Sequence, residues 1–288
     1  MDACDESYAY CHRLAQQAAS SFYFSFRFLP PAKRDAMCAL YAFLRRTDDL
    51  VDAEQSVEVR RAALNQWRQS LHRVQQQQFD DPILPALADT MTRYQIPAEY
   101  LETVVDGVEM DLDRPRFQSF SELEQYCYRV ASVVGFACLH VWGFHGAGAL
   151  QPAHQCGLAF QMTNILRDVK EDAQAGRVYL PLEDLRRFGC DVDALGSGVC
   201  DDAFRQLMRY EVERTEQFYR AAAKLNHWVE PDGWRVLGAM TNTYRALLAE
   251  IKRRDGDVLS SPVRISRWRK LRIATRWTLL PVRARAAW

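Results

Sequence analysis

Two short acidic segments, each with aspartates four residues apart, restrict how this chain can fold. They are Asp48 to Asp52 and Asp168 to Asp172, and each lies in a segment with a helical pattern. Residues four apart share one face of a helix, so the two carboxylates of each pair repel each other. A divalent cation relieves that repulsion, and Mg²⁺ binds carboxylates together with phosphate oxygens. The pairs predict two helices facing a magnesium-diphosphate site. The alternative is that each pair lies on a solvated acidic surface.

The residues that precede each pair extend it into a polar stripe. The first stripe is Tyr41, Arg45, Asp48 and Asp52, and the second is Gly157, Gln161, Asn164, Asp168 and Asp172. Both segments are otherwise apolar enough to be buried, and a buried polar stripe costs several kcal/mol unless it has partners. The stripes therefore favour a cavity that holds a metal and a phosphate.

The pattern is helical along nearly the whole chain, with Pro and Gly between the segments and no alternating strand. Ser121 and Glu124 have the spacing of a capping box. We expect one all-α domain over residues 1–288, since 48% of the residues are apolar and all-α domains of this size are often single. The expected helices are 4–19, 32–54, 56–78, 82–94, 97–110, 119–144, 152–173, 182–187, 201–228, 232–255 and 264–278.

The charge is unevenly distributed. The net charge is zero, yet the residues from Lys252 to Trp288 hold eleven Lys or Arg and two Asp. The segment 264–288 mixes these cations with Trp, Leu and Ile, which favours a helix on an anionic membrane surface. An ordinary terminal helix with solvated arginines, or arginines that reach a diphosphate, are the alternatives. Nucleic acid is not expected, because the rest of the chain is acidic and carries no nucleic-acid motif.

The eight cysteines lack paired Cys-x-x-Cys spacing, and His140 and His145 are five residues apart. Zinc, disulfides and a His-ligated metal are therefore not indicated. No secretory signal and no apolar run of membrane-spanning length is visible. We expect a cytoplasmic protein, with possible peripheral contact at the inner membrane surface.

Several blocks of this sequence resemble squalene and phytoene synthases. Matched blocks run in the expected order from about Ser20 to Tyr244. They are Ser20 to Tyr23, Leu29 to Pro31, Ala39 to Asp52, Tyr126 to Gly135, Gln161 to Asp172 and Gly176 to Pro181.

The resemblance implies a helical isoprenoid synthase fold around a central cavity, and head-to-head (1′–1) condensation of two prenyl diphosphates through a cyclopropylcarbinyl diphosphate. It implies Mg²⁺, two or three ions, at Asp48, Asp52, Asn164, Asp168 and Asp172, with Arg45 and Tyr126 joining the aspartates in catalysis. NADPH is possible but not indicated. The substrate-binding residues it implies are Ser20, Ser21, Phe22, Tyr41, Arg45, Ala131, Val134, Gly135, Gln161, Asn164, Arg167, Arg177 and Tyr244.

The product is less constrained. The blocks around Ser20 and Arg129 to Ser132 look like bacterial presqualene diphosphate synthases, and phytoene synthases more often carry Gly at the position of Ser132. We therefore expect farnesyl diphosphate as the substrate and presqualene diphosphate as the product. The alternatives are a phytoene synthase that uses geranylgeranyl diphosphate, a full NADPH-dependent squalene synthase, and a non-enzymatic helical adaptor at a membrane surface.

Overall fold

The computed structural model describes residues 3–17, 21–113 and 115–279, with only the backbone described for residues 21, 22, 267 and 279. These residues form helices and two isolated β-bridges and contain no strand, which confirms the all-α prediction. The α-helices are α1 (Ala3–Gln17), α2 (Ser21–Phe26), α3 (Pro31–Asp52), α4 (Val57–Val74), α5 (Leu84–Tyr94), α6 (Ala98–Glu109), α7 (Phe120–Cys127), α8 (Val133–Trp142), α9 (Leu150–Arg167), α10 (Val169–Gln174), α11 (Leu182–Phe188), α12 (Asp202–Ala222), α13 (Pro231–Arg253) and α14 (Arg267–Leu279).

Short helical turns of other types connect some of these elements. Four are 3₁₀ turns and one, η2, is a π-turn that joins α7 to α8 in place of the expected continuous helix 119–144. The turns are η1 (Met110–Asp113), η2 (Tyr128–Ser132), η3 (Ala147–Ala149), η4 (Leu195–Ser197) and η5 (Ala223–His227).

The helix starts follow local sequence chemistry. Pro31 is the first residue of α3, where proline's missing N–H costs nothing. The hydroxyl of Ser119, the residue at which the expected helix 119–144 opens, caps α7 by accepting from the Glu122 N–H at 3.4 Å, which confirms that start. The capping box predicted at Ser121 and Glu124 was wrong, because both residues lie inside α7. The α2 helix was not predicted, because its six residues are too few to show a helical period. Packing against α3 and α13 stabilises it.

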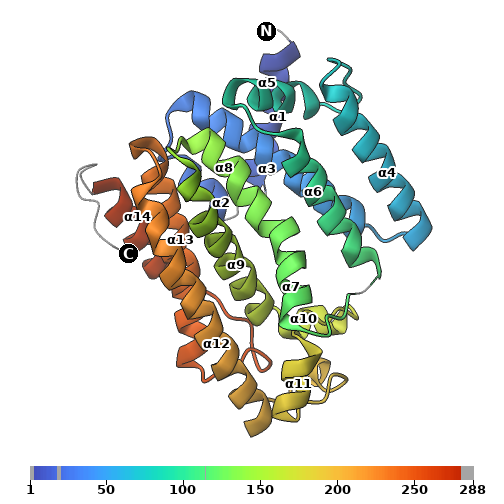
Figure 1. The fold of residues 1–288 in the computed structure, drawn as a ribbon, viewed down its shortest axis with the longest axis vertical. Helices are drawn as coiled ribbons and strands as arrows, with labels where there is room; N and C mark the ends of the chain where they lie inside the picture. Colours follow the sequence, from blue (N-terminus) through green and yellow to red (C-terminus); the bar gives the residue numbers. More distant parts are fainter. Residues whose placement is uncertain (1–2, 18–20, 114, 280–288) are drawn as a thin grey trace.

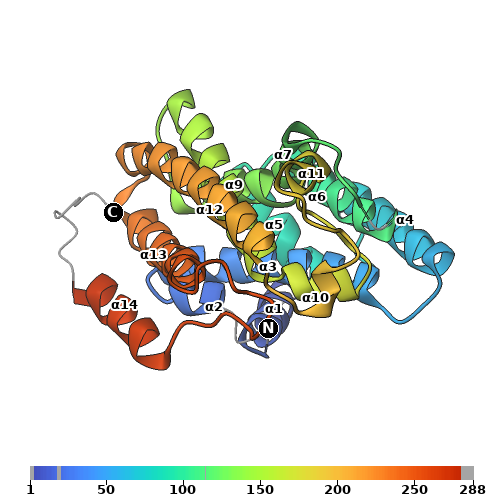
Figure 2. The same cartoon turned by 90° about the horizontal axis from the view of Figure 1, so that it is seen from below.

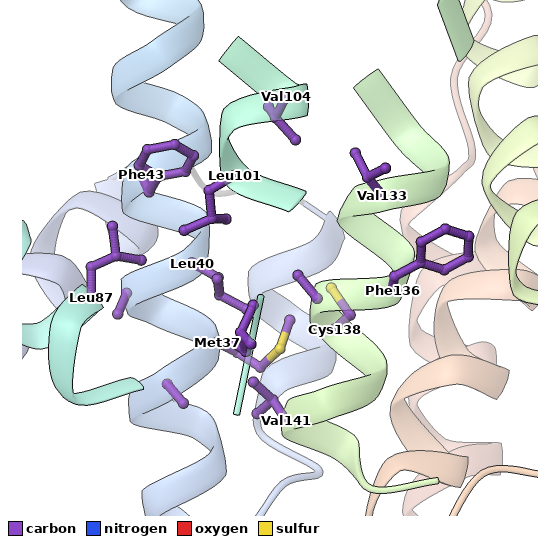
Figure 3. Packing of buried hydrophobic residues seen from close by; sticks show 14 of the residues in the cluster. Met37, Leu40, Phe43, Leu87, Leu101, Val104, Val133, Phe136, Cys138 and Val141 are labelled. Atoms are coloured by element: carbon purple, nitrogen blue, oxygen red, sulfur yellow. The ribbon is translucent and has the colours of Figure 1, made fainter. Parts of the chain in front are cut away.

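The long helices α3, α6, α8, α9, α12 and α13 form the body of the molecule, with α4 and α14 at opposite edges (Figures 1 and 2). One apolar core lies among α1, α3, α5, α6 and α8, and a second among α7, α9, α12 and α13. Figure 3 shows the first core from close by, where side chains of α3, α6 and α8 approach one another. Those that also line the cavity described below are Met37, Leu40, Leu101, Val104, Val133 and Cys138.

Candidate active site

A cavity of about 640 Å³ runs between the helices of the body. Its lining changes from apolar to polar along α3 and along α9. On α3 the lining runs from Met37 to Asp48, and on α9 from Ala153 to Arg167, which is about 21 Å at a rise of roughly 1.5 Å per residue. The α6 helix follows the same order and its line continues to Asp111 in η1. The cavity therefore has one polar mouth and a long apolar interior.

The first acidic pair lies at the C-terminal end of α3. Asp48 faces water at the mouth, yet protein atoms surround it closely, and this burial raises its pKa to about 7, with the charges of Asp52 and Asp111 adding to the shift. Arg45 pairs with Asp49 at 2.7 Å. Asp52 accepts from the Arg177 guanidinium at 3.0 Å. The pair thus has more negative charge than the neighbouring guanidinium groups neutralise.

The second acidic pair lies at a break in the chain, where the sequence predicted one helix over 152–173. The α9 helix ends at Arg167, Asp168 leaves helical geometry with φ −104° and ψ 13°, and α10 begins at Val169. Arg167 holds Asp168 in a two-pronged ion pair at 2.7 and 2.5 Å. Burial raises the pKa of Asp172 to about 7, with Asp168 as the next cause. The hydrogen bond from the Asp172 N–H to the Asp168 carbonyl persists across the break at 2.9 Å, and Asp172 lies close enough to Asp111 for their charges to interact.

A further carboxylate, Asp111, lies between the two pairs and was missed by the sequence reasoning. It accepts hydrogen bonds from the hydroxyls of Tyr126, at 3.1 Å to each oxygen, and of Tyr179, at 2.7 Å. Burial raises its pKa, although the two hydroxyls oppose the shift. Its charge also raises the pKa values of Asp48 and Asp172. The sequence could have revealed Asp111 by its spacing, because this acid continues the apolar stripe that α6 presents to the cavity.

The remaining polar lining comes from α9 and α13. Tyr244 stacks on Phe160 with ring centroids 4.4 Å apart. Burial raises the pKa of Tyr244 to about 12, while Arg167 and a hydrogen bond with Asn164 oppose the shift. Gln161 accepts from the Asn164 amide at 3.5 Å. These neutral groups continue the polar mouth a short distance inward.

Most of the predicted site residues come together here. Asp52, Asp168, Asp172 and Arg177 are joined to the mouth through ion pairs and charge interactions. Ser20 lies outside the described residues, and for Ser21 and Phe22 only the backbone is described, in α2. The predicted residues that line the cavity are Tyr41, Arg45, Asp48, Tyr126, Ala131, Val134, Gly135, Gln161, Asn164, Arg167 and Tyr244.

The π-turn η2, between α7 and α8, forms part of the cavity wall. It presents Val130 and Ala131 to the lining. Glycines on the neighbouring helices allow this close approach, since a Cβ on Gly157 would lie 2.7 Å from the Ser132 Cα and one on Gly107 would lie 2.7 Å from the Arg129 Cβ. π-Turns of this kind are frequent at functional sites.

The mouth suits a cation bound jointly with a ligand. No three His, Cys, Asp or Glu side chains in the part of the chain that the structure describes converge on one point that would hold a metal. The aspartates instead lie in pairs and two of them are engaged by arginines. Mg²⁺ is commonly held by one or two carboxylates with waters and substrate phosphates, so this donor set fits it.

Comparison with known proteins agrees with this geometry. The family model described as squalene/phytoene synthase matches residues 15–269. A phytoene synthase of Arthrospira platensis is 36% identical, with 92% of this chain and 90% of the relative covered. A phytoene synthase of Mycobacterium tuberculosis is 33% identical, with 95% and 91% covered.

Two solved structures share the fold over most of their length. A ligand complex of a dehydrosqualene synthase has a TM-score of 0.86 and 28% identity, with 96% of each chain covered. The squalene synthase HpnC from Alicyclobacillus acidocaldarius has a TM-score of 0.80 and 25% identity, with 88% of this chain and 98% of that chain covered. The cavity with its two aspartate pairs and the match over most of the chain agree: this protein belongs to the squalene/phytoene synthase family and is a prenyltransferase.

Proposed function

We propose that this enzyme condenses two molecules of geranylgeranyl diphosphate head to head, through a cyclopropylcarbinyl diphosphate, to phytoene. Head-to-head condensation of prenyl diphosphates is the chemistry of the family. The observation that carries the choice of substrate is that relatives 33 to 36% identical, matched over about nine tenths of their length, are named phytoene synthases. This choice departs from the farnesyl diphosphate that the sequence blocks favoured.

The shape of the cavity supports a substrate with a charged head and a long apolar tail. The mouth combines carboxylates with Arg45 and Arg167, whereas the interior is lined by side chains such as Leu101, Val133 and Leu237. A diphosphate at the mouth would leave its tail in an interior with few polar groups. Such an interior protects an allylic cation from water, which is a requirement of this chemistry.

The residues at the mouth have separable roles in the proposal. We assign Mg²⁺, two or three ions, to Asp48, Asp52, Asp168, Asp172 and Asn164. When bound, Mg²⁺ would neutralise negative charge on the departing diphosphate. Arg45, Arg167 and Arg177 would contact diphosphate oxygens, and each of these arginines now holds an aspartate. Asp111 would hold Tyr126 and Tyr179 in place through their hydroxyl groups.

Presqualene diphosphate synthesis from farnesyl diphosphate is the second candidate. Two observations favour it: Ser132, where phytoene synthases more often have Gly, and the similarity to a dehydrosqualene synthase over 96% of both chains. Ser132 is the last residue of the π-turn η2, and its hydroxyl contacts His154 Nδ1 at 2.8 Å. The non-enzymatic adaptor hypothesis is dropped, since the family consists of prenyltransferases.

The two candidates are distinguished by offering both substrates to the purified protein with Mg²⁺ in one tube. The ratio of the two products then gives the ratio of the kcat/KM values for the two substrates. The competition is run once with NADPH and once without it. Products are identified by mass analysis before and after phosphatase treatment. A forty-carbon hydrocarbon independent of NADPH supports the proposal. Presqualene diphosphate as the dominant product would establish the second candidate, and squalene only with NADPH would indicate a full squalene synthase.

A chelation control tests the metal. Activity should disappear in EDTA and return with excess Mg²⁺. Turnover that persists in EDTA would contradict the roles assigned to the aspartates.

A further inference from the structure

A second hollow, distant in the sequence from the acidic pairs, lies between α12, α13 and α14 and is here called the basic groove. Its volume is about 620 Å³. Six cationic side chains and one carboxylate, Glu216, line it. The cations are Arg220, Arg245, Lys252, Arg269, Arg272 and Arg276. The basic groove is therefore a concentrated positive surface on a molecule whose net charge is zero.

Most of this positive charge is uncompensated. Lys252 contacts Glu216 at 2.7 Å and Arg220 lies at 4.0 Å from the same carboxylate. The side chains of Arg245, Arg269, Arg272 and Arg276 make no ion pair or hydrogen bond with any other residue between 3 and 279 that the structure describes. Guanidinium groups gathered without acidic partners repel one another, which an anionic ligand would relieve.

The α14 helix is fixed against the body, so the groove has a defined wall. Trp277 is 1% exposed and meets Trp234 edge to face at 5.1 Å. It fills a space that only a glycine at position 238 leaves open, since a Cβ there would lie 2.0 Å from the Trp277 ring. The groove is thus formed by packed helices, with Tyr219 buried at its base.

The face of α14 opposite Trp277 carries two largely exposed apolar side chains. Trp268 is 80% exposed and Leu271 is 56% exposed. At about 100° per residue these two share one face of the helix, with Arg272 beside them and Arg269 and Arg276 next towards the groove. The arginines consequently lie between the exposed apolar side chains and the body of the protein.

We propose that α14 and the basic groove dock the enzyme on an anionic lipid bilayer, with a phospholipid headgroup phosphate in the groove and Trp268 and Leu271 inserted at the interface. Arg and Lys near a membrane are attracted to anionic headgroups, and Trp is enriched at this interface. A soluble phosphate compound would match the cations but would leave Trp268 and Leu271 exposed. The juxtaposition of both features favours the bilayer. This inference does not depend on the proposed substrate.

The test is sedimentation of the full-length protein with vesicles of phosphatidylcholine alone or mixed with an equal amount of phosphatidylglycerol. We expect binding only to the mixed vesicles. The triple variant Arg269→Gln, Arg272→Gln, Arg276→Gln should lose affinity on the order of a hundredfold, at about fivefold for each cation. The double variant Trp268→Ala, Leu271→Ala keeps every charge and should still bind at least about tenfold more weakly.

A matched control removes the same charge elsewhere. Arg13, Arg93 and Arg186 are exposed and lie outside the groove. Their combined replacement by Gln should leave vesicle binding within about twofold of the unmodified protein, because charges outside the groove contribute only a weak long-range attraction to the vesicle. Equal losses in this control and in the groove variant would show that net charge alone acts, and would overturn the proposal.

Two further experiments distinguish an anionic bilayer from other anionic ligands. At equal ionic strength, inorganic phosphate should displace the protein from vesicles no better than chloride does. Specific displacement by phosphate, with calorimetric binding of phosphate in the absence of vesicles, would instead assign the groove to a soluble anion. Binding of a DNA duplex that is lost in the groove variant, without vesicle binding, would also overturn the proposal.

Discussion

At the scale of single residues, the mouth of the cavity is organised by an excess of carboxylates. Asp48 and Asp172 have pKa values raised to about 7, and in each case burial is the main cause and another aspartate the next. Arg167 and Arg177 neutralise Asp168 and Asp52 but are also the groups suited to bind phosphate. Substrate binding would therefore exchange these partners. The arginines would leave the aspartates and contact the diphosphate, and the aspartates would bind Mg²⁺.

Removing one aspartate of each pair should abolish activity without unfolding the protein. We expect Asp48→Ala and Asp168→Ala each to lower kcat/KM by at least about a hundredfold, the typical cost of one transition-state electrostatic group. Thermal melting should change by only a few degrees, because these side chains are partly exposed. Glu171→Ala, an exposed neighbour in the second segment, should retain most of the activity. Normal turnover in either aspartate variant would exclude the assigned roles.

The raised pKa values also predict how the metal-free protein responds to pH. A carboxyl group with a folded-state pKa above its unfolded value stabilises the fold fully below the unfolded value, near 4, and loses that contribution as the pH rises through the folded value, here about 7. In EDTA, Tm should therefore rise when the pH is lowered from about 8 to about 6.

The double variant Asp48→Asn, Asp172→Asn provides the reference for this pH effect. It should melt at a higher temperature than the unmodified protein at the upper pH, and the difference should shrink at the lower pH. Glu211 has a pKa raised to about 8 by burial and titrates in both proteins, so it cancels in the comparison. A pH dependence that is identical in the two proteins would show that the two aspartates do not cause it.

The sequence predicted much of this site because its chemistry follows a helical period. Tyr41, Arg45 and Asp48 do line one cavity, as four-residue and three-residue spacings require. Asp111 was missed because it lies in η1, beyond the end of α6, where a single acid in an acidic run resembles a solvated helix end. The pairing of Arg45 with Asp49 and of Arg177 with Asp52 depends on side-chain rotamers and on tertiary contacts, which spacing does not determine.

At the scale of elements, long helices were predictable and their interruptions were not. The apolar period over 119–144 is real, yet five residues within it adopt a π-turn. The turn packs closely against neighbouring helices, and Gly107 and Gly157 outside the segment leave room for that approach. A second interruption, at Asp168, divides the expected helix 152–173 into α9 and α10. Periodicity averages over many residues and so does not resolve a single irregular turn.

Gly157 should therefore be more sensitive to an added methyl group than Gly135, a helical glycine with open space around it. Gly157→Ala would place its Cβ 2.7 Å from backbone atoms of the π-turn. We expect destabilisation of about 1–3 kcal/mol from overpacking. The matched change Gly135→Ala has its nearest neighbour at 3.8 Å and should be neutral or stabilising, since Ala favours helix. Urea unfolding of both variants measures this, and equal free energies of unfolding would refute the packing argument.

At the scale of the whole molecule, the uneven charge distribution seen in the sequence becomes a surface. The predicted C-terminal helix exists as α14, and its arginines line a groove with residues of α12 and α13. None of the described helices is long and apolar enough to cross a membrane. The sequence located the cations from Lys252 onwards but not Arg220 and Arg245 beside them, because those two residues come from helices that meet α14 only in the folded protein.

Two tryptophans on α14 should behave oppositely. Trp277→Ala removes a buried ring and should cost about 3–5 kcal/mol of unfolding free energy, or loosen α14 locally. Trp268→Ala removes an exposed ring and should change the free energy of unfolding by less than about 0.5 kcal/mol. Chemical denaturation followed by circular dichroism, with hydrogen exchange of the α14 amides, checks both. A large loss of stability in Trp268→Ala would show that this ring packs in solution.

The α13 helix separates the cavity from the basic groove and presents a different face to each. Thr243 and Tyr244 line the cavity, whereas Asn242 and Arg245 line the groove. The next turn repeats the pattern, with Leu247 on the cavity and Leu248 on the groove. Neighbouring positions in this sequence therefore line two different hollows. A substitution scan along α13 should yield two interleaved phenotypes, turnover and lipid affinity, each recurring with the period of the helix.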